Sequence, residues 1–509
     1  MSRIDPTTIA ARLRELADYL RGSAKDRYRA RAYDRAADRV EKVPALDQLI
    51  EAGELKRLPG IGDSLAKTIT DLAHSGTVPL LERLRTQGPA PVRTIRVKTE
   101  PGLLLPIARE TSEQIVRGLR TAPAALAVAV AGAARRGVEL VDVIEIVVAT
   151  DRPEEILEHV RRSALVAHAA TTVPERIEAL LVTGEPLLVH LTPLATLGTA
   201  IVRATSTPEH LAALNVLADA QGASLDAASE AAVYAAVGLP LVPVEARDDA
   251  SALDDARAGK LDALVELDDI RGSIHCHTSW SDGTGSIDAM ARAALALGHE
   301  YIAITDHSRA AHYAGGLDED RLRRQWDEID EVEGRLPIRI LRGTEVDILA
   351  DGALDWPDHV LERLEVVIAS VHQRHKHGEA ETTRRLVRAL SAPVFKIWGH
   401  PLGRLVGRRP PIPCRLDEAF DALAEAGGAI ELNGDPHRLD LAPDLARRAR
   451  DRGLSFVCSA DAHSVNGLGA VSYAVDMARR ARLTTADVLN TRTPAAFAAT
   501  VMPARPLAA

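Results

Sequence analysis

Short apolar runs and amphipathic helical stretches alternate along the C-terminal half of this 509-residue chain. The apolar runs are expected strands at residues 274–277, 301–304, 338–341, 366–369, 394–398, 429–432 and 455–458. Regular alternation of a strand with a helix predicts βα units and a parallel sheet. About seven such units are most simply closed into a barrel.

Histidines and acidic residues stand at or just after the C-terminal ends of nearly all these expected strands. They are His275, His277, Asp282, His307, Glu345, His372, His400, Asp461 and His463. Active sites of α/β barrels are assembled at that end of the strands, so these side chains should converge on one mouth. Residues two apart in a strand point to the same face, which pairs His275 with His277.

Imidazole and carboxylate groups together suit Zn, Mn or Fe ions. More than four ligands imply more than one ion, because one tetrahedral ion would already be saturated. The cysteines Cys276, Cys414 and Cys458 have no CxxC spacing, which argues against a disulfide framework or a thiolate zinc site. We expect these cysteines to be packing residues.

The same segments resemble the successive motifs of the PHP (polymerase and histidinol phosphatase) domain, in the form found at the C-terminus of bacterial family X DNA polymerases. The motifs are HCHTSWSDG (275–283), AITDHS (303–308), GTEVDIL (343–349), DGALDWPDHVL (351–361), IASVH (368–372), WGHPLGRLVGRRPP (398–411), NGDPHRLDL (433–441) and SADAH (459–463). The resemblance implies a distorted (β/α)7 PHP barrel over residues 270–500, with three divalent ions, Zn or Mn.

The resemblance also implies a role for each ligand-type residue. The three implied sets are His275, His277, Glu345 and Asp461; Glu345, His372 and His400; and Asp282, His307 and His463. Glu345 would bridge two ions, and Glu345, Asp461 and His400 would be catalytic. The implied reaction is hydrolysis of a phosphate ester by water that the ions activate. Nearby arginines could hold flanking phosphates through paired hydrogen bonds, or could be solvated surface residues. They are Arg374, Arg404, Arg408, Arg409 and Arg438.

Residues 1–85 have apolar positions at three- and four-residue spacing, which predicts a small α-helical domain. Its segment LKRLPGIGDSLAKTI (55–69) resembles a helix-hairpin-helix DNA-binding motif. Gly60 and Gly62 would let a tight hairpin bring backbone N–H groups against a phosphate without reading bases. Lys56 and Lys67 would add positive charge. The partner this implies is DNA, bound independently of its sequence through its backbone.

Residues 86–242 are expected to be a mixed α/β region with strands at 127–130, 143–149 and 187–191, followed by a linker at 243–269. By the resemblance this region is a nucleotidyltransferase-like palm, in which the family has a Gly-Ser pair and three aspartates. The corresponding residues here are Gly132-Ala133, Val143, Glu145 and, near the third position, Leu188. Two-metal phosphoryl transfer needs converging carboxylates, so we interpret the palm as degenerate.

The whole chain therefore predicts a multidomain protein with a helix-hairpin-helix domain, a degenerate palm and a PHP barrel. The expected function is that of a DNA-directed, metal-dependent phosphoesterase, a 3′-5′ exonuclease or 3′-end-processing enzyme of DNA repair with an inactive polymerase module. Three alternatives remain open: a small-molecule phosphomonoesterase of the histidinol-phosphatase type, a non-catalytic DNA-binding scaffold, and a family X polymerase that retains synthesis through Glu145.

Composition limits the partners further. The net charge of −10 argues against a nucleic-acid coat, although a local basic patch could still bind a phosphate backbone. The start of the sequence lacks a signal pattern, and the longest apolar run, residues 123–134, is too short to span a bilayer. We therefore expect a cytoplasmic protein without a membrane partner, and the sequence indicates no obligate protein partner.

Overall fold

The computed structural model describes residues 6–21, 29, 32–33, 36–37, 39–40, 43, 46–58, 61–86, 102–373 and 377–501. The chain divides into two compact units, Met1–Glu100 and Pro101–Ala509. This division confirms that the protein is multidomain. In the part of the chain that is described, no helix has the length and apolar content needed to cross a membrane.

The first unit is helical, as predicted. Its elements are α1 (Pro6–Arg21), α3 (Leu46–Glu51), η1 (Leu55–Arg57), α4 (Asp63–Ser75) and α5 (Pro79–Thr86). Apolar residues at helical spacing give each of these helices one face to bury. Leu13 and Leu16 of α1 share a buried core with Ile69 and Leu72 of α4. Helix α4 ends at Gly76, whose positive φ of 74° suits glycine.

The second unit begins with a five-stranded sheet of order β2-β4-β7-β6-β5. Its strands are β2 (Ala127–Ala131), β4 (Ile144–Ala149), β5 (Val166–Val173), β6 (Arg176–Leu181) and β7 (Pro186–Thr192). β4 and β7 run parallel, and the remaining neighbours are antiparallel. Three of these strands, β2, β4 and β7, were predicted, whereas the β5–β6 hairpin was missed. The short strands β1 (Leu103–Leu104) and β3 (Leu140–Val141) form a separate pair.

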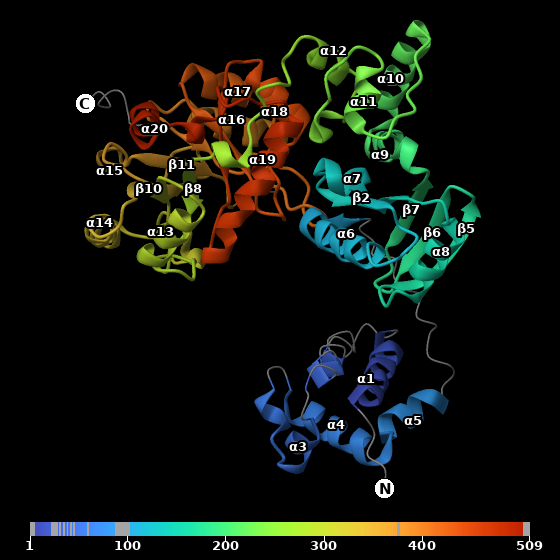
Figure 1. Ribbon diagram of the computed structural model, residues 1–509. Helices are drawn as coiled ribbons and strands as arrows, with labels where there is room; N and C mark the ends of the chain where they lie inside the picture. The colour runs from blue at the N-terminus through green and yellow to red at the C-terminus, as the bar shows by residue number, and fades with distance from the viewer. Residues whose placement is uncertain are drawn as a thin grey trace. The chain divides into compact units, whose positions relative to one another are not determined.

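Helices cover both faces of this palm-like sheet (Figure 1). On one face, Ile146 and Val148 of β4 share a core with α6 (Leu105–Leu119) and α8 (Pro153–Arg162). On the other face, Val147 packs with Ile201 of α9 (Leu197–Thr205). The short elements α7 (Gly132–Arg136) and η2 (Leu194–Thr196) complete this region.

A group of short helices follows the sheet in the chain and has a small apolar core of its own. Its elements are α10 (Pro208–Gln221), α11 (Glu230–Ala235), η3 (Val244–Ala246), α12 (Ser251–Arg257) and η4 (Leu267–Asp269). Leu214 of α10, Tyr234 of α11 and Leu253 of α12 are buried together in it. Residues 243–269, expected to be a linker, thus contribute helices and buried side chains to this core.

The seven predicted strands of the C-terminal half all exist and form one parallel sheet of order β14-β13-β12-β11-β10-β9-β8. They are β8 (Gly272–Cys276), β9 (Tyr301–Ile304), β10 (Arg339–Asp347), β11 (Val366–Ser370), β12 (Ile397–Trp398), β13 (Ala429–Asn433) and β14 (Ser455–Ser459). The two end strands meet through Ala462, whose N–H donates to His275 at 3.0 Å and whose carbonyl accepts from His277 at 2.9 Å. The sheet is therefore a nearly closed barrel, as predicted.

Helices follow the barrel strands and pack around them (Figure 1). They are α13 (Ile287–Ala296), η5 (His312–Ala314), α14 (Glu319–Glu333), α15 (Asp358–Leu361), α16 (Glu379–Leu390), α17 (Leu416–Glu425), α18 (Pro443–Arg450), η6 (Val465–Ala470), α19 (Val471–Arg480), η7 (Leu489–Thr491) and α20 (Pro494–Val501). Alternate strand residues such as Leu341 and Ile368 form an inner core, while their neighbours Ile340 and Val367 belong to the larger core that includes the helices.

One end of the barrel is closed by aromatic packing. Phe497 of α20 lies against Tyr301 with ring centroids 5.1 Å apart, and both are fully buried. A Cβ at Gly272 would come within 2.2 Å of the Tyr301 ring, so only glycine fits there. The opposite end, where the strands finish, is left for polar side chains.

Buried ion pairs join the palm-like region to the barrel within the second unit. Glu139, next to β3, contacts Arg404 of a barrel loop and Arg480 of α19, each at 3.1 Å. Burial alone would raise the pKa of Glu139, but the two guanidinium groups outweigh burial and hold its pKa below the ordinary value. The palm-like region and the barrel are thus linked by the carboxylate of Glu139 in the first and two arginines in the second.

We expect Glu139→Gln to lower the free energy of unfolding by about 3 kcal/mol at pH 7, because it takes a carboxylate from two largely buried arginines, of which Arg480 keeps a second one, Asp248 at 2.8 Å. Since folding lowers the pKa of Glu139, its contribution is present above the unfolded pKa of about 4.3 and is lost as the pH falls through the folded pKa. The difference between variant and wild type should therefore shrink below about pH 4.

Urea unfolding followed by tryptophan fluorescence measures this effect, because all four tryptophans lie in the barrel. Glu158→Gln is the control, since Glu158 makes an exposed pair with Arg161 and should change stability by less than about 0.5 kcal/mol. Equal unfolding midpoints for the two variants at pH 7 would contradict the role given to Glu139.

Candidate metal centre

The ends of the barrel strands bring all nine predicted ligand residues together. His275 lies in β8 and Glu345 in β10, whereas the others follow their strands within a few residues. Their nitrogen and oxygen atoms form four groups in which each atom lies within 4.8 Å of the others. The groups are His277, Asp282, His307 and His463; His275, Glu345 and His400; His275, His277 and Asp461; and His307, Glu345 and His372.

Glu345 is the centre of the cluster. Its two carboxylate oxygens lie near ring nitrogens of five histidines, although the side chain is almost fully buried. The distances are 2.8 Å to His400, 3.1 Å to His372, 3.3 Å to His275, 3.3 Å to His307 and 3.6 Å to His277. No other carboxylate in the described part of the barrel is given so many imidazole neighbours.

The grouping differs in detail from the implied ligand sets. His372 and His400, expected in one set, fall into two groups that share Glu345. His277, expected with Asp461, also joins Asp282, His307 and His463. A carboxylate that belongs to two groups is placed as a bridging ligand would be.

Strand β13 supplies a buried carboxylate that the sequence analysis missed. Glu431 Oε1 lies 2.5 Å from His275 Nδ1 and accepts from Ser459 Oγ at 2.6 Å. Its Oε2 accepts from the backbone N–H of His400 at 2.5 Å and from Asn433 Nδ2 at 3.1 Å. Glu431 therefore orients two of the predicted ligands without being one of them.

Asp347 also orients a predicted ligand, whereas Asp306 fixes the loop after β8. Asp347 Oδ1 lies 3.2 Å from His372 Nδ1, which leaves Nε2 of that ring directed at Glu345. Asp306 is buried and accepts from the backbone and the hydroxyl of Thr278, both at 2.8 Å. The signal for Asp347 was its place two residues after Glu345 in the same strand, where side chains share a face.

The backbone at this mouth is strained at three predicted ligands. His275, Asp461 and His400 have positive φ angles of 63°, 50° and 26°. Non-glycine residues in such conformations cost on the order of 1–3 kcal/mol each and persist only where the surrounding structure enforces them. The barrel thus holds these side chains in fixed directions.

The crowding of charges shifts the pKa values in opposite directions. Burial would raise the pKa of Glu345, but His372, His275 and His307 hold it well below its ordinary value. Burial would lower the pKa of His372, but Glu345 and Asp347 raise it to about 10. For His277, burial and the neighbouring His307 together lower the pKa to about 4. Binding a cation would therefore displace protons from part of the cluster.

The donor atoms fit divalent cations. Buried ring nitrogens of His275 (Nε2), His277 (Nδ1 and Nε2) and His307 (Nδ1) have no hydrogen-bond partner among the described residues. Buried polar atoms without partners are costly unless something else binds them. A set of imidazole nitrogens with carboxylate oxygens is the ligand set of Zn and Mn ions.

The predicted phosphate-binding arginines are placed differently from one another. Arg438 Nε lies 3.2 Å from Asp461 Oδ2, at the edge of the cluster. Arg404 donates to the carbonyls of Arg438 and Leu439 and to Glu139, so its donors serve the loop and the palm-like region. Arg409 donates to Gly403 at 2.9 Å, and Arg408 is exposed. Arg374 lies outside the described residues.

The predicted DNA-binding residues of the first unit lie around the start of α4. Lys56 is exposed and pairs with Asp63, and Lys67 is exposed on the helix. Gly62 precedes α4 with φ −90° and ψ −179°, a conformation open to any residue, and a Cβ there would meet no atom within 4 Å. Gly60 lies outside the described residues.

The palm-like sheet has no comparable cluster in its described residues. Leu188 of β7 is the direct neighbour of Glu145 on β4, as expected for the third aspartate position. Glu145 Oε2 instead lies 3.0 Å from His190 Nε2. Val143 and Asp142 precede β4, and Asp142 is exposed. Glu178 of β6 lies opposite Leu188 on the same face, but it pairs with Arg176 at 2.6 Å.

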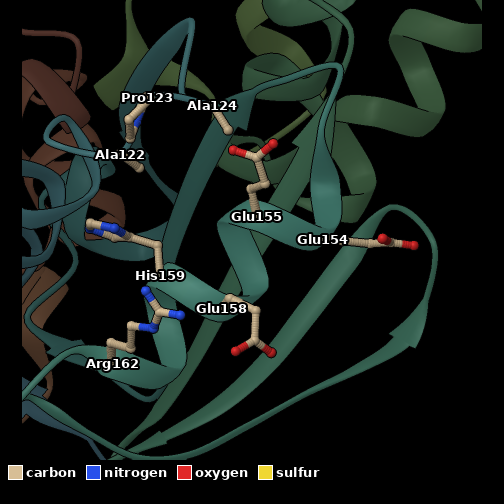
Figure 2. Close-up of a pocket in the computed structure, with 8 residues that line it drawn as sticks. All are labelled: Ala122, Pro123, Ala124, Glu154, Glu155, Glu158, His159 and Arg162. Atoms are coloured by element: carbon tan, nitrogen blue, oxygen red, sulfur yellow. The ribbon is translucent and has the colours of Figure 1, made fainter.

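A hollow of about 390 Å³ lies beside α8, away from this sheet face (Figure 2). It is lined by Ala122, Pro123, Ala124, Glu154, Glu155, Glu158, His159 and Arg162. Figure 2 shows Glu154 pointing away from the other lining side chains. His159 is used within the fold, because its Nε2 lies 3.0 Å from the carbonyl oxygen of Gly118. Three glutamates in this wall make the hollow unsuited to a phosphate.

Comparison with known proteins agrees with this arrangement. Residues 6–78 match the helix-hairpin-helix domain, and residues 273–435 match the PHP domain. The chain is 32% identical over 408 residues to the DNA polymerase/3′-5′ exonuclease PolX of Bacillus subtilis (strain 168), covering 77% of this chain and 70% of that protein. A probable phosphatase of Thermoanaerobacter sp. (strain X514) is 30% identical over 43% of this chain and 89% of its own length. A probable histidinol-phosphatase of Deinococcus radiodurans is 27% identical over 38% of this chain and 87% of its own length.

Replacing Glu345 tests its central position. We expect Glu345→Ala to lower the affinity for Mn²⁺ or Zn²⁺ by more than about 100-fold, because two groups of ligand atoms lose their common member. Metal content after gel filtration measures the effect, with circular dichroism as the check on folding. Glu362→Ala, an exposed carboxylate of the barrel, should bind as wild type does. Unchanged metal content in Glu345→Ala would remove the bridging assignment.

Proposed function

The chain belongs to the bacterial PolX family, and from that premise we propose that it is a DNA-directed, metal-dependent phosphoesterase. Its proposed activity is 3′-5′ exonuclease or 3′-end processing in DNA repair, and its polymerase module is proposed to be inactive. The observation that carries this proposal is the contrast between the two candidate sites. The barrel mouth gathers nine ligand-type side chains, whereas the palm-like face keeps Glu145 beside His190.

The barrel residues have separable tasks in this proposal. Divalent ions bound by the cluster would lower the pKa of a water and neutralise charge on a phosphate ester. Glu345 and Asp461 stay ionised, because neighbouring histidines hold their pKa values well below the ordinary range despite burial. Arg438, anchored by Asp461, is the arginine best placed to hold a phosphate oxygen of the substrate.

The first unit is proposed to bind the DNA backbone. Among the described residues nothing requires glycine at position 62, since its φ is ordinary and a Cβ would meet no atom within 4 Å. Close approach of an external group explains it better. A phosphate beside the first turn of α4 would meet free backbone N–H groups and the positive end of the helix.

The inactive palm is argued from charge. Nucleotide addition needs two divalent ions beside a triphosphate, and converging carboxylates hold such ions. Leu188 puts an apolar side chain beside Glu145, and Ile201 of α9 packs on the same sheet face. An ion placed there would lose its hydration and gain few carboxylate ligands, because Glu178 across Leu188 already pairs with Arg176.

A second candidate is a small-molecule phosphomonoesterase. It is favoured by the similarity of the barrel alone to proteins named as probable phosphatases. The helix-hairpin-helix domain and the family membership favour DNA. Competition between a 3′-recessed oligonucleotide and histidinol phosphate for the same protein separates the two candidates.

The main test is an assay with 5′-end-labelled primer–template DNA and Mn²⁺, with and without dNTPs. We expect shortening of the primer from its 3′ end under both conditions, because the clusters of ligand-type side chains among the described residues all lie in the barrel. His275→Ala should lower the shortening rate by at least about a hundredfold, since it removes a cluster ligand.

The His275→Ala background also exposes any synthesis that degradation would mask. No extension of a gapped template is expected in it. Template-directed extension that disappears in a His275→Ala/Glu145→Ala double variant would show that the palm is active. Release of phosphate from the metabolite without any DNA shortening would favour the phosphomonoesterase.

Gly62→Val tests the DNA-binding hairpin separately. We expect DNA affinity to fall by about tenfold and by similar factors for unrelated sequences, because phosphate contacts carry no base information. Thermal unfolding should stay at the wild-type temperature, since the side chain enters open space. Fluorescence anisotropy at fixed salt measures binding. Gly53 is not a suitable control, because its positive φ would strain any side chain placed there. Lys260→Ala, on an exposed side chain of the second unit, is the matched control.

A further inference from the structure

One exposed aromatic ring stands beside the histidine cluster. Tyr313 lies in η5, the short helix that follows His307 in the chain. The residue is 67% exposed, whereas every other described tyrosine, tryptophan and phenylalanine is buried or partly buried. Aromatic residues make up 3% of the sequence, so an exposed ring at this position needs a reason.

The ring is close to two predicted ligands without being covered by them. Its centroid lies 6.4 Å from that of His307 and 6.2 Å from that of His372. Both contacts are edge-to-face, with interplanar angles of 65° and 68°. Neither imidazole is stacked on the phenol, and together with its exposure this leaves ring surface available to a ligand.

The loop that carries Tyr313 is fixed by hydrogen bonds at both ends. Leu317 N–H donates to the carbonyl of His307 at 3.0 Å, and Gly316 N–H donates to Ala311 at 3.1 Å. Ala310 N–H donates to the Asp355 carboxylate at 2.6 Å, and Arg321 donates to the carbonyl of Gly315 at 2.7 Å. A ring held on such a loop loses little freedom when a planar ligand stacks on it.

If a phosphodiester of DNA is bound at the cluster, the nearest planar group is the base of the terminal nucleotide. The base of a terminal nucleotide lies one sugar away from its phosphate, so it would reach the side of the mouth. Every base has a π-face, and stacking on an aromatic side chain does not depend on base identity. A small phosphate ester without an aromatic ring would gain no stacking from Tyr313.

We propose that Tyr313 stacks on the 3′-terminal base of the strand being shortened and thereby favours nucleic acid over phosphate esters that carry no aromatic ring. This inference rests on the proposed function, because it assumes that DNA is the substrate of the barrel. Tyr313 is a positioning and specificity residue in this assignment, since its ring contacts the base and not the reacting phosphorus.

The test combines two protein forms with two DNA ends. Wild type and Tyr313→Ala are assayed on one oligonucleotide with a normal 3′-terminal nucleotide and on another whose terminal residue is an abasic tetrahydrofuran. We expect Tyr313→Ala to lower kcat/KM about fivefold to a hundredfold on the normal end and to leave the abasic end unchanged. Tyr313→Phe should restore the normal value, because the ring is kept.

Equilibrium binding provides a readout that does not depend on turnover. A 3′-terminal 2-aminopurine should be quenched when wild type or Tyr313→Phe binds it in EDTA, and the quenching should be lost in Tyr313→Ala. Val465→Ala is the control, because Val465 is an exposed apolar residue shortly after His463 and has no ring. It should behave as wild type in both experiments.

The outcomes separate the inference from the function on which it rests. Equal losses on the normal and the abasic end, or no loss on either, would overturn the stacking role while shortening by wild type continues to support the function. If wild-type protein shortens neither oligonucleotide, the proposed function fails and the inference fails with it.

Discussion

The barrel mouth is organised around one buried carboxylate, Glu345, and the nitrogen atoms that surround it. A carboxylate in such a place is costly unless opposite charge compensates it, and protons on the histidines do so only in part. The neighbouring features serve the same arrangement. The parallel strands end at this point, and the backbone is held at positive φ for His275, His400 and Asp461. Glu431 contacts the ring of His275 and the backbone N–H of His400. A bound cation would supply positive charge that the histidine protons supply only in part.

The sequence predicted the barrel and the gathering of its ligands because both follow from local rules. Strand period and helix alternation are local, and the C-terminal ends of parallel strands meet whatever the loops do. Glu431 escaped notice because its role depends on which side chain of another strand faces it. Arg404 resembled a phosphate ligand in its loop, but its contacts depend on Glu139, more than 200 residues earlier. The β5–β6 hairpin was missed because the polar residues of β5 weaken the apolar alternation that marks a strand.

The fold of the palm-like sheet does not depend on the positions at which the resemblance led us to expect metal-binding aspartates. Its apolar cores on both faces involve β4 and are independent of the positions of Val143, Glu145 and Leu188. In the inactive palm that we propose, the absence of these carboxylates would remove repulsion between like charges and would cost no packing. The ion pairs of Glu139 with Arg404 and Arg480 then give this region a continuing structural use, because the Arg404 loop also carries His400. The sheet thus has a structural use that does not depend on whether the palm-like region is active.

Cys276 lies between two predicted ligands in the sequence, yet it is buried among the apolar side chains of the larger core, between the strands and the helices. Burial and the nearby Asp461 and Asp306 raise the pKa of its thiol, and burial also raises the pKa values of Cys414 and Cys458. Thiols that stay protonated react slowly with peroxide. Oxidative inactivation would therefore act through a redox-active ion such as Fe²⁺, whereas Zn²⁺ has no such chemistry. The response of the purified protein to peroxide would thus differ between Fe²⁺-loaded and Zn²⁺-loaded preparations.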